Sequence, residues 1–544
     1  MKNNIFFILT ILMIVIANNI SAQGFYLNSL GYLPKEEKII TVSPDVHSFK
    51  LVEANTGNIV FEGNTSDTVS QADVGMTVRR ADVSSVTTPG EYYLQANDSL
   101  KSPQFLIAPD VYNFAFKTTI RAFYLWRCGT AVEGNYNGIH FSHDACHIQD
   151  GGLDSIGYAN QQKDGTGGWH DAGDYGKYVV NAGITIGLLF MAWDQFGDKI
   201  KNISLDLPET APGYPGYLEE LKWETDWLLK MVYPDGSGKV SHKLTRTNFS
   251  GFIKPEDDLE KRYFTGWSSA ATADFVGIMA QAARYFKPYD AEYAQKCLDA
   301  AWLSYSFLKD NPAFHSSPWQ GFRTGAYYTN DEDDRLWAAA EMWETTGDTA
   351  CLSDFETRFR AIGVKVEENW DWGNIQNMGT FTYILSRRKG KDPEVLDEAK
   401  KQVIEVADRI VEKAKKDIFN RPLGNKYYWG CNGTVARQVL NLQVANQVSP
   451  NVKYVNTALD AVHNLFGCNQ YGRSFVTGLG FNPPMNPHDR RSGSDDIIEP
   501  WPGYIVGGGT KPTDWLDEER SFSTNEIAIN WQAALVYALA GFIQ

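Results

Sequence analysis

The sequence has little cysteine, few basic residues relative to acidic ones, and a low overall charge content. Six cysteines in 544 residues are too few for a disulfide scaffold. Fifty lysines and arginines against 66 acidic residues leave a net charge of −16, which argues against a nucleic-acid-binding protein because such proteins usually carry a basic face. With 43% hydrophobic and 21% charged residues, the composition excludes disorder, collagen and a polytopic membrane protein, and it is typical of a folded globular protein.

Length and aromatic content give the first positive indications. A chain of 544 residues is too long for one ordinary domain, and two to four domains are expected. Aromatic residues make up 13% of the chain, with 16 tryptophans and 27 tyrosines. Many of them belong to a core, but the number also allows flat stacking surfaces of the kind that suits sugar rings.

The first 22 residues have the pattern of a secretory signal peptide. Lys2 gives a positive start, Ile5 to Ile16 form the apolar stretch, and Ser21-Ala22 resembles a small-residue cleavage site. The alternative, an uncleaved membrane anchor, is disfavoured because the apolar run is short for a membrane span. The sequence therefore predicts an exported protein, periplasmic or secreted, whose mature chain starts near Gln23.

Two regions with different patterns follow. Residues 23–110 contain short β-branched and aromatic runs separated by turn signals, which predicts a small β-sandwich with strands at Ile39–Val42, Phe49–Val52, Ile59–Phe61 and Tyr92–Leu94. Residues 111–544 show apolar residues at helical spacing in roughly a dozen segments, joined by long loops rich in glycine, proline and aromatic residues. No strict short repeat is visible, so a single large helical domain is expected.

A first candidate site is the segment Gly167–Tyr178, which contains Asp171 and Asp174. Two carboxylates three residues apart on a turn can face one cavity, and Ala172 and Gly173 between them allow close approach of substrate. Because carboxylates held that close repel, one is expected to be hydrogen-bonded while the other holds a water. A solvated turn or a calcium loop is the alternative interpretation.

A second candidate lies near the C-terminus, where Trp515-Leu516-Asp517 is followed by Asn525-Glu526. Ser523, Thr524 or Asn525 can cap the last helix, which would place Glu526 in its first turn. There the helix dipole favours the charged form, so Glu526 could simply be a stabilising residue. To serve as a general acid it would need neighbouring carboxylates and aromatic walls that raise its pKa.

The third candidate is the loop Ser474–Arg490, which holds too many glycines and prolines for regular structure and ends in His488-Asp489-Arg490. A rigid loop of this kind can bring several hydrogen-bond donors to one spot. Without the other two motifs, an ordinary structural loop would be the preferred interpretation.

Together and in this order, the three motifs resemble glycoside hydrolase family 9, the endoglucanase family also called cellulase E. Ser474–Arg490 is similar to the histidine signature of that family at every constrained position, and Trp515–Glu526 resembles its acidic signature. Gln532 departs from the pattern, since the family commonly has Asn there. Asn28–Pro34 looks like the start of the immunoglobulin-like domain that precedes the catalytic domain in one branch.

The resemblance implies an all-α (α/α)6-barrel catalytic domain preceded by an immunoglobulin-like β-sandwich, and hydrolysis of β-1,4-glucan with inversion. By the same resemblance Asp174 is the general base, Asp171 helps to hold the nucleophilic water, Glu526 is the general acid and Asp517 supports the acid and the substrate. The chemistry is compatible, because inversion needs an acid and a base on opposite faces of the sugar, about 6.5–9.5 Å apart.

The resemblance also suggests substrate contacts. His488 and Arg490 look like contacts to sugar hydroxyls, and Trp429 resembles a tryptophan of the family's cleft. Trp319, in another aromatic loop, is a second candidate for stacking on sugar. The expected partner is a β-glucan polysaccharide or oligosaccharide, and neither a nucleic acid nor a membrane; the expected state is a monomer.

Two metal sites are predicted. Cys128, Cys146, His147 and His170 make a closed tetrahedral donor set for structural zinc, with His143 as a competing ligand and a Cys128–Cys146 disulfide as the alternative. The immunoglobulin-bearing members of the family are similar here. The oxygen-rich run from residue 329 resembles the calcium loop of the family, and an acidic helix start is the alternative. The calcium ligands expected by resemblance are Thr329, Asp333, Asp334 and Asp371.

Several functions remain open at this point. The preferred one is an exported endo-β-1,4-glucanase acting on cellulose-type glucans; a preference for xyloglucan or mixed-linkage glucan is an alternative. A second class is a catalytically inactive carbohydrate-binding protein on the same fold, and a third is a zinc hydrolase of another bond. The intact set of carboxylates favours the first.

Overall fold

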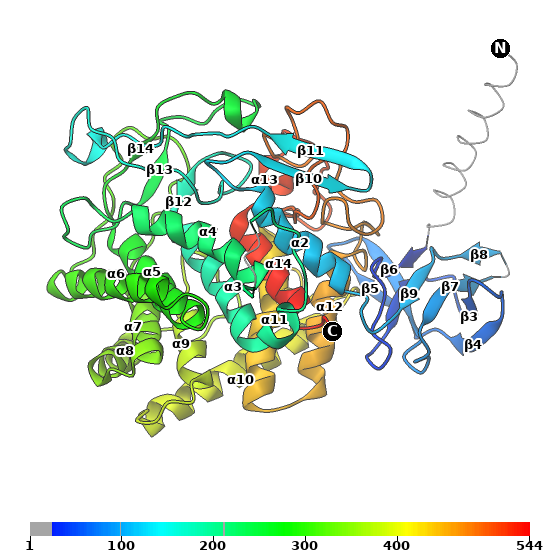
Figure 1. Cartoon of the computed structure of the whole chain (residues 1–544). Coiled ribbons are helices and arrows are strands. Elements are labelled where there is room, and N and C mark those ends of the chain that lie inside the picture. Colours follow the sequence, from blue (N-terminus) through cyan, green and yellow to red (C-terminus); the bar gives the residue numbers. More distant parts are fainter. Residues whose placement is uncertain (1–23, 98, 210–212) are drawn as a thin grey trace, which may run out of the picture.

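The computed structural model of the protein describes residues 24–97, 99–209 and 213–544, and the predicted signal peptide lies outside this part. The N-terminal part, up to Ile107, is built from strands, and the chain becomes mainly helical from Asn113 (Figure 1). The strands form one flank of the molecule, and the helices form its larger body.

The N-terminal part consists of two antiparallel sheets. One has the order β1-β2-β6-β5, and the other has the order β4-β3-β7-β8 with β9 also paired to β7. Alternate residues of β7 are buried, as expected for a strand with one face on a core, and Leu94 packs there with Ile40 and Leu51. The four predicted strands are confirmed. The strands are β1 (Phe25–Tyr26), β2 (Ile39–Val42), β3 (Ser48–Glu53), β4 (Ile59–Asn64), β5 (Val69–Gln71), β6 (Met76–Asp82), β7 (Gly90–Ala96), β8 (Leu100–Lys101) and β9 (Phe105–Ile107).

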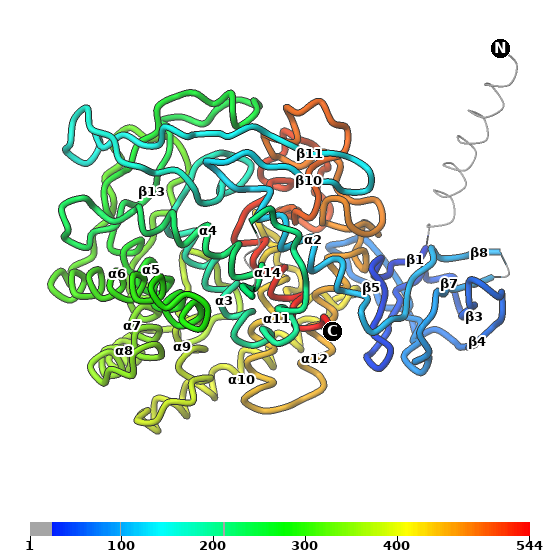
Figure 2. Tube along the Cα trace, viewed as in Figure 1, coloured from blue at the N-terminus to red at the C-terminus, as the bar shows by residue number. Residues whose placement is uncertain are grey.

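The helical part packs its helices in succession. Each of α3, α5, α7 and α9 contacts the next in this order, and α14 packs against both α3 and α11. In Figure 2 the C-terminal red segment accordingly runs through the middle of the helices. The helices are α2 (Asn113–Leu125), α3 (Val179–Ile200), α4 (Gly216–Lys230), α5 (Ser269–Phe286), α6 (Ala291–Asp310), α7 (Glu332–Thr346), α8 (Thr349–Ala361), α9 (Gln376–Leu385), α10 (Pro393–Lys416), α11 (Cys431–Val448), α12 (Val452–Leu465), α13 (Phe522–Asn525) and α14 (Ile529–Ala540).

Burial differs between these helices. All twelve residues of α14 are buried, whereas α10 buries only one face, with Val403, Val406 and Ile410 among the covered residues. Within the described residues, α3 is the one helix long and apolar enough to cross a membrane by length and composition. However, 78% of its most apolar window is buried inside the protein, as in the core helix of a folded domain.

The strand-rich part is fastened to the helical part by side-chain and backbone contacts. Val78 packs with Ile418 and Phe419 in a shared apolar cluster. Ser29 Oγ donates to the carbonyl oxygen of Phe466, and Arg80 Nη2 donates to that of Asp417 at 2.9 Å. These contacts join the two parts near the C-terminal ends of α10 and α12.

Short strands lie in the long loops on one end of the helices (Figure 1). A hairpin is formed by β10 (Val132–Tyr136) and β11 (Ile139–His143), and a small antiparallel sheet by β12 (Lys177–Tyr178), β13 (Lys243–Thr245) and β14 (Tyr263–Phe264). β12 forms the end of the first candidate motif, so the sheet fixes the end of that loop to two later segments of the chain.

Candidate active site

The three sequence motifs meet at one place, and their main chains are paired. Ala172 of the first motif forms an antiparallel bridge with Ala528, just after Glu526. Glu526 in turn forms a parallel bridge with His488 of the third motif. The N–H of Ile529 also donates to the carbonyl oxygen of Asp171 at 2.9 Å. Segments more than 300 residues apart therefore hold one another in register.

Gly173 is the point of closest approach between the first and third motifs. A Cβ at this position would lie 2.1 Å from the carbonyl oxygen of His488, so only glycine fits. The carbonyl oxygen of Gly173 accepts hydrogen bonds from Arg490, from the backbone N–H at 3.2 Å and from Nη1 at 2.6 Å. Glycine was predicted here for substrate access, but in the structure it admits another segment of the chain.

Asp171 and Asp174 are both buried and are held by different donors. Oδ1 of Asp171 accepts from Asn181 Nδ2 at 2.7 Å, and its Oδ2 accepts from the hydroxyl of Tyr327 at 2.6 Å. Oδ2 of Asp174 accepts from the N–H of Gly176 at 2.9 Å and from the hydroxyl of Tyr178 at 2.8 Å. Both carboxylate oxygens of Asp171 thus accept hydrogen bonds. At Asp174, the hydrogen bonds from the described residues all go to Oδ2.

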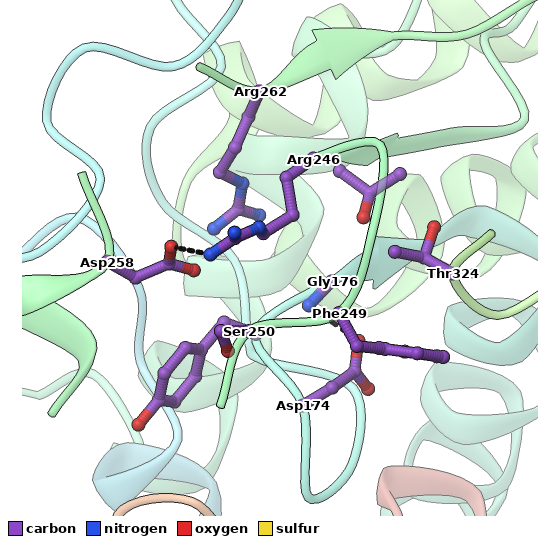
Figure 3. A pocket seen from close by; sticks show the side chains of 10 residues that line it. Asp174, Gly176, Arg246, Phe249, Ser250, Asp258, Arg262 and Thr324 are labelled. Atoms are coloured by element: carbon purple, nitrogen blue, oxygen red, sulfur yellow. Dashed lines mark hydrogen bonds and ion pairs between the residues drawn. The ribbon is translucent and has the colours of Figure 1, made fainter. Parts of the chain in front are cut away.

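A small cavity lies beside Asp174 (Figure 3). Its volume is ≈ 10 Å³, about what one water molecule needs. Thr245, Thr324 and Arg246 are among its polar lining residues, and Arg246 forms an ion pair with Asp258 on the far side. The surroundings of Asp174 are therefore polar and can hold water.

The expectation that Glu526 lies in the first turn of the last helix is wrong. Glu526 is extended, with φ −71° and ψ 153°, between the short α13 and α14, whose N-cap is Ala528. The backbone groups of residues 526–528 pair with His488, Val506 and Ala172 and so are not available to a helix. As a result, the helix dipole does not act on Glu526 as it would on a first-turn residue.

The electrostatics of the site favour a protonated Glu526. Burial raises its pKa well above the usual value, and the charges of Asp174 and Asp171 raise it further, while Arg490 and Trp429 act in the opposite direction. Burial and the charge of Asp174 also raise the pKa of Asp171 to about 8, against the hydrogen bonds from Tyr327 and Asn181. The three carboxyl groups therefore lie close enough for their charges to act on one another.

The carboxylate of Asp517 already accepts several hydrogen bonds from the protein. Its carboxylate accepts from Arg473 Nη2 at 2.7 Å and from the N–H groups of Met485 and Asn486 at 3.0 and 2.9 Å. Asn525 Nδ2, one residue before Glu526, lies 3.4 Å from the same carboxylate. Asp517 therefore ties the third motif to the segment that carries Glu526.

His488 and Arg490 also have protein partners. Nδ1 of His488 lies 2.7 Å from the carbonyl oxygen of Glu519, and the ring packs edge-on against Phe252 and Phe522. Arg490, besides its bonds to Gly173, donates from Nε to the carbonyl oxygen of Ser250 at 3.1 Å. Arg490 thus braces the loop of Asp171 and Asp174.

Two tryptophans named from the sequence are half exposed. Trp429 is 50% exposed, packs edge-on against Phe522 at 5.5 Å and acts to lower the pKa of Glu526. Trp319 is 52% exposed and lies 6.2 Å from the ring of Tyr328. Of the two, only Trp429 acts on the pKa of an acidic residue of the site.

Two family models match this chain. A family model described as glycosyl hydrolase family 9 matches residues 112–539, and a model described as the cellulase N-terminal ig-like domain matches residues 21–101. The chain belongs to glycosyl hydrolase family 9. Its N-terminal strands form the immunoglobulin-like domain that the resemblance predicted, and its helices form the family 9 catalytic domain.

Relatives cover nearly the whole chain. It is 54% identical over 519 residues to Endoglucanase D of Acetivibrio thermocellus, covering 95% of this chain and 83% of the relative. It is 32% identical over 552 residues to the xyloglucan-specific endo-beta-1,4-glucanase BoGH9A of Bacteroides ovatus, covering 94% and 92%. The solved structure of a Zn-binding triple mutant of the family 9 endoglucanase J30 matches with TM-score 0.88 and 32% identity, covering 94% of this chain and 99% of that one.

This family 9 chain also has a cluster of metal-binding residues. One ligand atom from each of Cys128, Cys146, His147 and His170 lies within 4.8 Å of the others. His147 Nδ1 is 3.6 Å from Cys128 Sγ and 3.4 Å from His170 Nε2, which is 3.8 Å from Cys146 Sγ. Bonds of about 2.3 Å to sulfur and 2.0 Å to nitrogen separate tetrahedral ligands by roughly 3.3–3.8 Å, so the four residues fit zinc.

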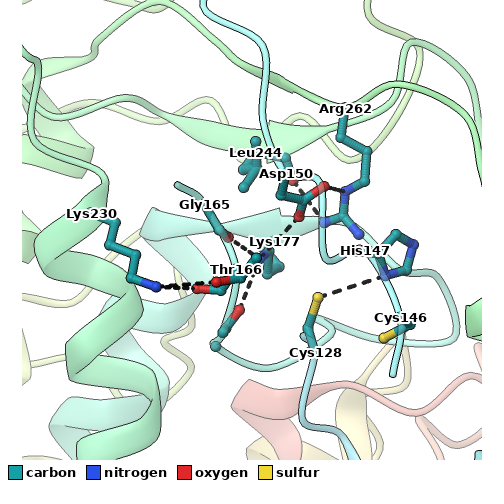
Figure 4. Close-up of polar contacts among 12 residues, drawn as sticks. Cys128, Cys146, His147, Asp150, Gly165, Thr166, Lys177, Lys230, Leu244 and Arg262 are labelled. Atoms are coloured by element: carbon teal, nitrogen blue, oxygen red, sulfur yellow. Dashed lines mark hydrogen bonds and ion pairs between the residues drawn. The ribbon is translucent and has the colours of Figure 1, made fainter. Parts of the chain in front are cut away.

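Details of the cluster agree with a metal site. Both cysteines are free rather than joined as a disulfide, and His143 is outside the group, with Nδ1 2.8 Å from the carbonyl oxygen of Asp144. Burial lowers the pKa of His170 to about 3, so its ring is neutral, as a ligand must be. Lys177, next to the cluster in Figure 4, donates to the carbonyl oxygens of Gly165 and Gly167 at 2.7 and 2.8 Å.

The expected calcium ligands do not converge in the same way. Asp371 is engaged by Arg437 and Asn530, at 2.5 and 2.7 Å. Asp334 is buried, and Asp274 on α5 is among the groups that raise its pKa; among the described residues the carboxylate oxygens of both have no hydrogen-bond partner, while Asp333 accepts from the N–H of Ile375. Within the described residues, the cysteine–histidine cluster is the only group of three or more such side chains that could hold a metal ion. The donor set for calcium therefore remains a prediction.

Three site residues were missed in the sequence. Tyr178, Asn181 and Tyr327 hold the two aspartates, but tyrosine and asparagine are common, and Tyr327 is far from the motif in the chain. Gln532, which departs from the family pattern, is fully used: it accepts from the N–H of Ile505 and donates to carbonyl oxygens on α2 and in the loop before Ile505.

Proposed function

We propose that this protein is an exported endo-β-1,4-glucanase that hydrolyses its substrate with inversion of configuration. The observation that carries the proposal is the main-chain pairing that brings Asp174 and Glu526 to one site, with electrostatic coupling between their carboxyl groups. Membership of family 9 and 54% identity to a protein named Endoglucanase D support the β-1,4-glucan as substrate class.

In the proposed reaction, Asp174 is the general base and Glu526 the general acid. A water molecule attacks the anomeric carbon and transfers a proton to the carboxylate of Asp174. The bond from that carbon to the leaving oxygen breaks, its electron pair stays on the oxygen, and Glu526 supplies the proton that completes the new hydroxyl group. The raised pKa of Glu526 supports this role because the acid must start protonated.

The other residues assist these two. Asp171 helps to hold the water, while Asp517 supports the segment of Glu526. His488 and Arg490 contact sugar hydroxyls, and Trp429 stacks on a sugar ring beside the acid. The half-exposed face of Trp429 and its effect on the pKa of Glu526 support a sugar subsite at that point.

We also propose the (α/α)6 barrel for residues 111–544, preceded by the immunoglobulin-like domain at 23–110. Support comes from the alternation along the chain of deeply buried helices with helices exposed on one face. The proposed inner ring is α3, α5, α7, α9, α11 and α14.

The proposed metal is zinc, held by Cys128, Cys146, His147 and His170. Its ligand set is complete without water, so zinc would supply a structural cross-link rather than chemistry. It would fix the segment before Asp171, because His170 is the neighbour of that aspartate. Three expectations stay predictions: a calcium site, export directed by residues 1–22, and a monomeric state. The calcium ligands would be Thr329, Asp333, Asp334 and Asp371.

The deciding experiment is a panel of soluble cellulose derivatives, mixed-linkage glucan and xyloglucan with analysis of product lengths and anomeric form. It is run on the wild type, Asp174→Asn and Glu526→Gln. We expect internal cleavage of at least one β-1,4-glucan by the wild type and loss of turnover in both variants. Polysaccharide binding without turnover by the wild type would instead identify an inactive binding protein.

Xyloglucan is a second candidate substrate because BoGH9A, 32% identical, is named xyloglucan-specific. The same panel separates the two. Prompt loss of turnover on chelation, with the fold intact, would point to a catalytic zinc and would contradict the structural assignment.

A further inference from the structure

Tyr178 is the last residue of β12 and reaches back to the loop that it follows. Its hydroxyl donates to Oδ2 of Asp174 at 2.8 Å. The same oxygen accepts from the N–H of Gly176 at 2.9 Å. Two donors thus fix one oxygen of Asp174, and among the hydrogen bonds of the described residues none ends on Oδ1.

The position of the Tyr178 hydroxyl is fixed from the opposite side. The N–H of Gly325 donates to the Tyr178 oxygen at 3.1 Å, so the phenol oxygen accepts on this side while its own hydrogen is directed to Asp174. A Cβ at Gly325 would lie 2.9 Å from Cζ of Tyr178, and a Cβ at Gly176 would lie 2.2 Å from the Tyr178 oxygen. The two glycines therefore permit the main chain to close around the phenol.

A lysine fixes the segment that contains Gly325. Lys243 on β13 is the cross-strand partner of Tyr178, and its Nζ donates to the carbonyl oxygen of Gly325 at 2.8 Å. Lys243 is 1% exposed and lies within electrostatic range of Asp174. The small sheet thus supplies the phenol of Tyr178. It also supplies the Lys243 ammonium group, which fixes Gly325, the residue whose N–H donates to that phenol.

The same arrangement includes the neighbour of Asp174. The ring of Tyr178 packs against that of Tyr327, with centroids 5.0 Å apart, and the hydroxyl of Tyr327 donates to Asp171. Each aspartate therefore receives one phenol hydrogen bond from a packed pair of tyrosines. A shift of one ring would disturb the other.

We propose that Tyr178 is a positioning residue for the reaction, whose hydroxyl holds Oδ2 of Asp174 so that Oδ1 is left to accept the proton of the attacking water. This inference rests on the proposed function, since it takes Asp174 as the general base. The phenol touches the base and not the substrate. It sets which oxygen is free and stabilises the charged form of the carboxylate.

Other ionisable groups also surround Asp174. Asp171, Lys243, Tyr327, His488 and Glu526 are the neighbours on the substrate side and on the small sheet. Arg246, Asp258 and Arg262 lie across the small cavity. Tyr178→Phe leaves all of them in place and removes only the hydroxyl.

The test is the pH profile of kcat/KM on a soluble cello-oligosaccharide for the wild type, Tyr178→Phe, Asp174→Asn and a matched control, Tyr217→Phe. Tyr217 is also fully buried, and its hydroxyl donates to the carbonyl oxygen of Leu189 at 2.8 Å, outside the site. We expect the acid limb of Tyr178→Phe to move up by about one pH unit, because a hydrogen bond to a charged group is lost.

Below that limb the rate of Tyr178→Phe then falls about tenfold, with KM close to that of the wild type. Tyr217→Phe is expected to lose thermal stability to a similar extent but to keep the wild-type acid limb. An inactive Asp174→Asn beside an unchanged limb in Tyr178→Phe overturns this inference alone. A fully active Asp174→Asn overturns the proposed function and this inference with it.

Discussion

The backbone of Glu526 is paired with the backbone of His488 in a parallel bridge, and the N–H of His488 donates to the carbonyl oxygen of the preceding Asn525 at 2.8 Å. The carboxyl group of Glu526 is therefore mounted on an extended segment that is held from the side by another loop. Such mounting keeps the side chain in place without a helix, and it leaves the carboxyl group in a buried, acidic environment that favours its protonated form.

Glu526→Gln should abolish most of the activity while the protein stays folded. The amide has nearly the same shape but no proton to give to the leaving oxygen, and general acid catalysis is worth about 10²–10⁴-fold in rate. The measurement is kcat on a soluble β-glucan with the melting temperature as a check on folding. Glu518→Gln is the control, because Glu518 is exposed and should keep wild-type activity. A Glu526→Gln variant with more than a tenth of the wild-type rate would contradict the assignment.

Gly173→Ala should damage the site more than its size suggests. The added Cβ would lie 2.1 Å from the carbonyl oxygen of His488, a backbone atom that cannot turn away. We expect the free energy of unfolding to fall by about 1–3 kcal/mol and the activity to fall further, because Asp174 and His488 must move apart. Denaturant unfolding and kcat measure the two effects. Gly363→Ala, where an added Cβ meets nothing within 4 Å, is the control and should lose neither.

Local sequence patterns predicted helices and strands correctly where neighbouring residues alone determine the structure. The run Ile39–Val42 forms β2 with the expected bounds, since alternation and β-branched residues are local signals. The helix with Phe275 and Ile278 is likewise observed as α5. The place of Glu526 was predicted wrongly, because cap-forming residues also precede it and the pairing with His488 and Ala172 comes from distant segments.

The site residues, too, fall into those that the sequence could predict and those that it could not. With six cysteines and nine histidines, the chain has few enough of these residues for them to be noticed, and the structure brings Cys128, Cys146, His147 and His170 together. Tyr178 and Tyr327 could not be singled out among 27 tyrosines, because their role depends on a hydroxyl reaching an aspartate across the fold. Such partners become visible only when distances are known.

Removal of the metal should weaken the fold before it affects the chemistry. Zinc bound to the native cluster stabilises the native state, so a strong chelator or Cys128→Ser should lower the melting temperature. Activity at low temperature should decline only as the segment of His170 loosens. Calorimetry and zinc content by elemental analysis, beside kcat, measure this. Cys297→Ser is the control, since Cys297 is buried outside the cluster and should leave the zinc content unchanged.

Trp429→Phe should change both the affinity for substrate and the pH range of activity. The indole N–H of Trp429 favours the charged form of the Glu526 carboxyl group and so lowers its pKa. Phenylalanine cannot donate, so the pKa of Glu526 should rise further above its usual value. In the proposed reaction Glu526 is the protonated acid, so activity should persist below its pKa and be lost as the pH rises through it.

The alkaline limb of the kcat profile should therefore move to higher pH in Trp429→Phe, and KM should increase severalfold because a smaller ring covers less of the sugar. Trp319→Phe is the matched control, since Trp319 is exposed to the same degree but packs beside Tyr328. It should raise KM without moving the limb. If the limb of Trp429→Phe moved to lower pH, Trp429 would not act on Glu526 as a hydrogen-bond donor, and its effect would have to be assigned to desolvation.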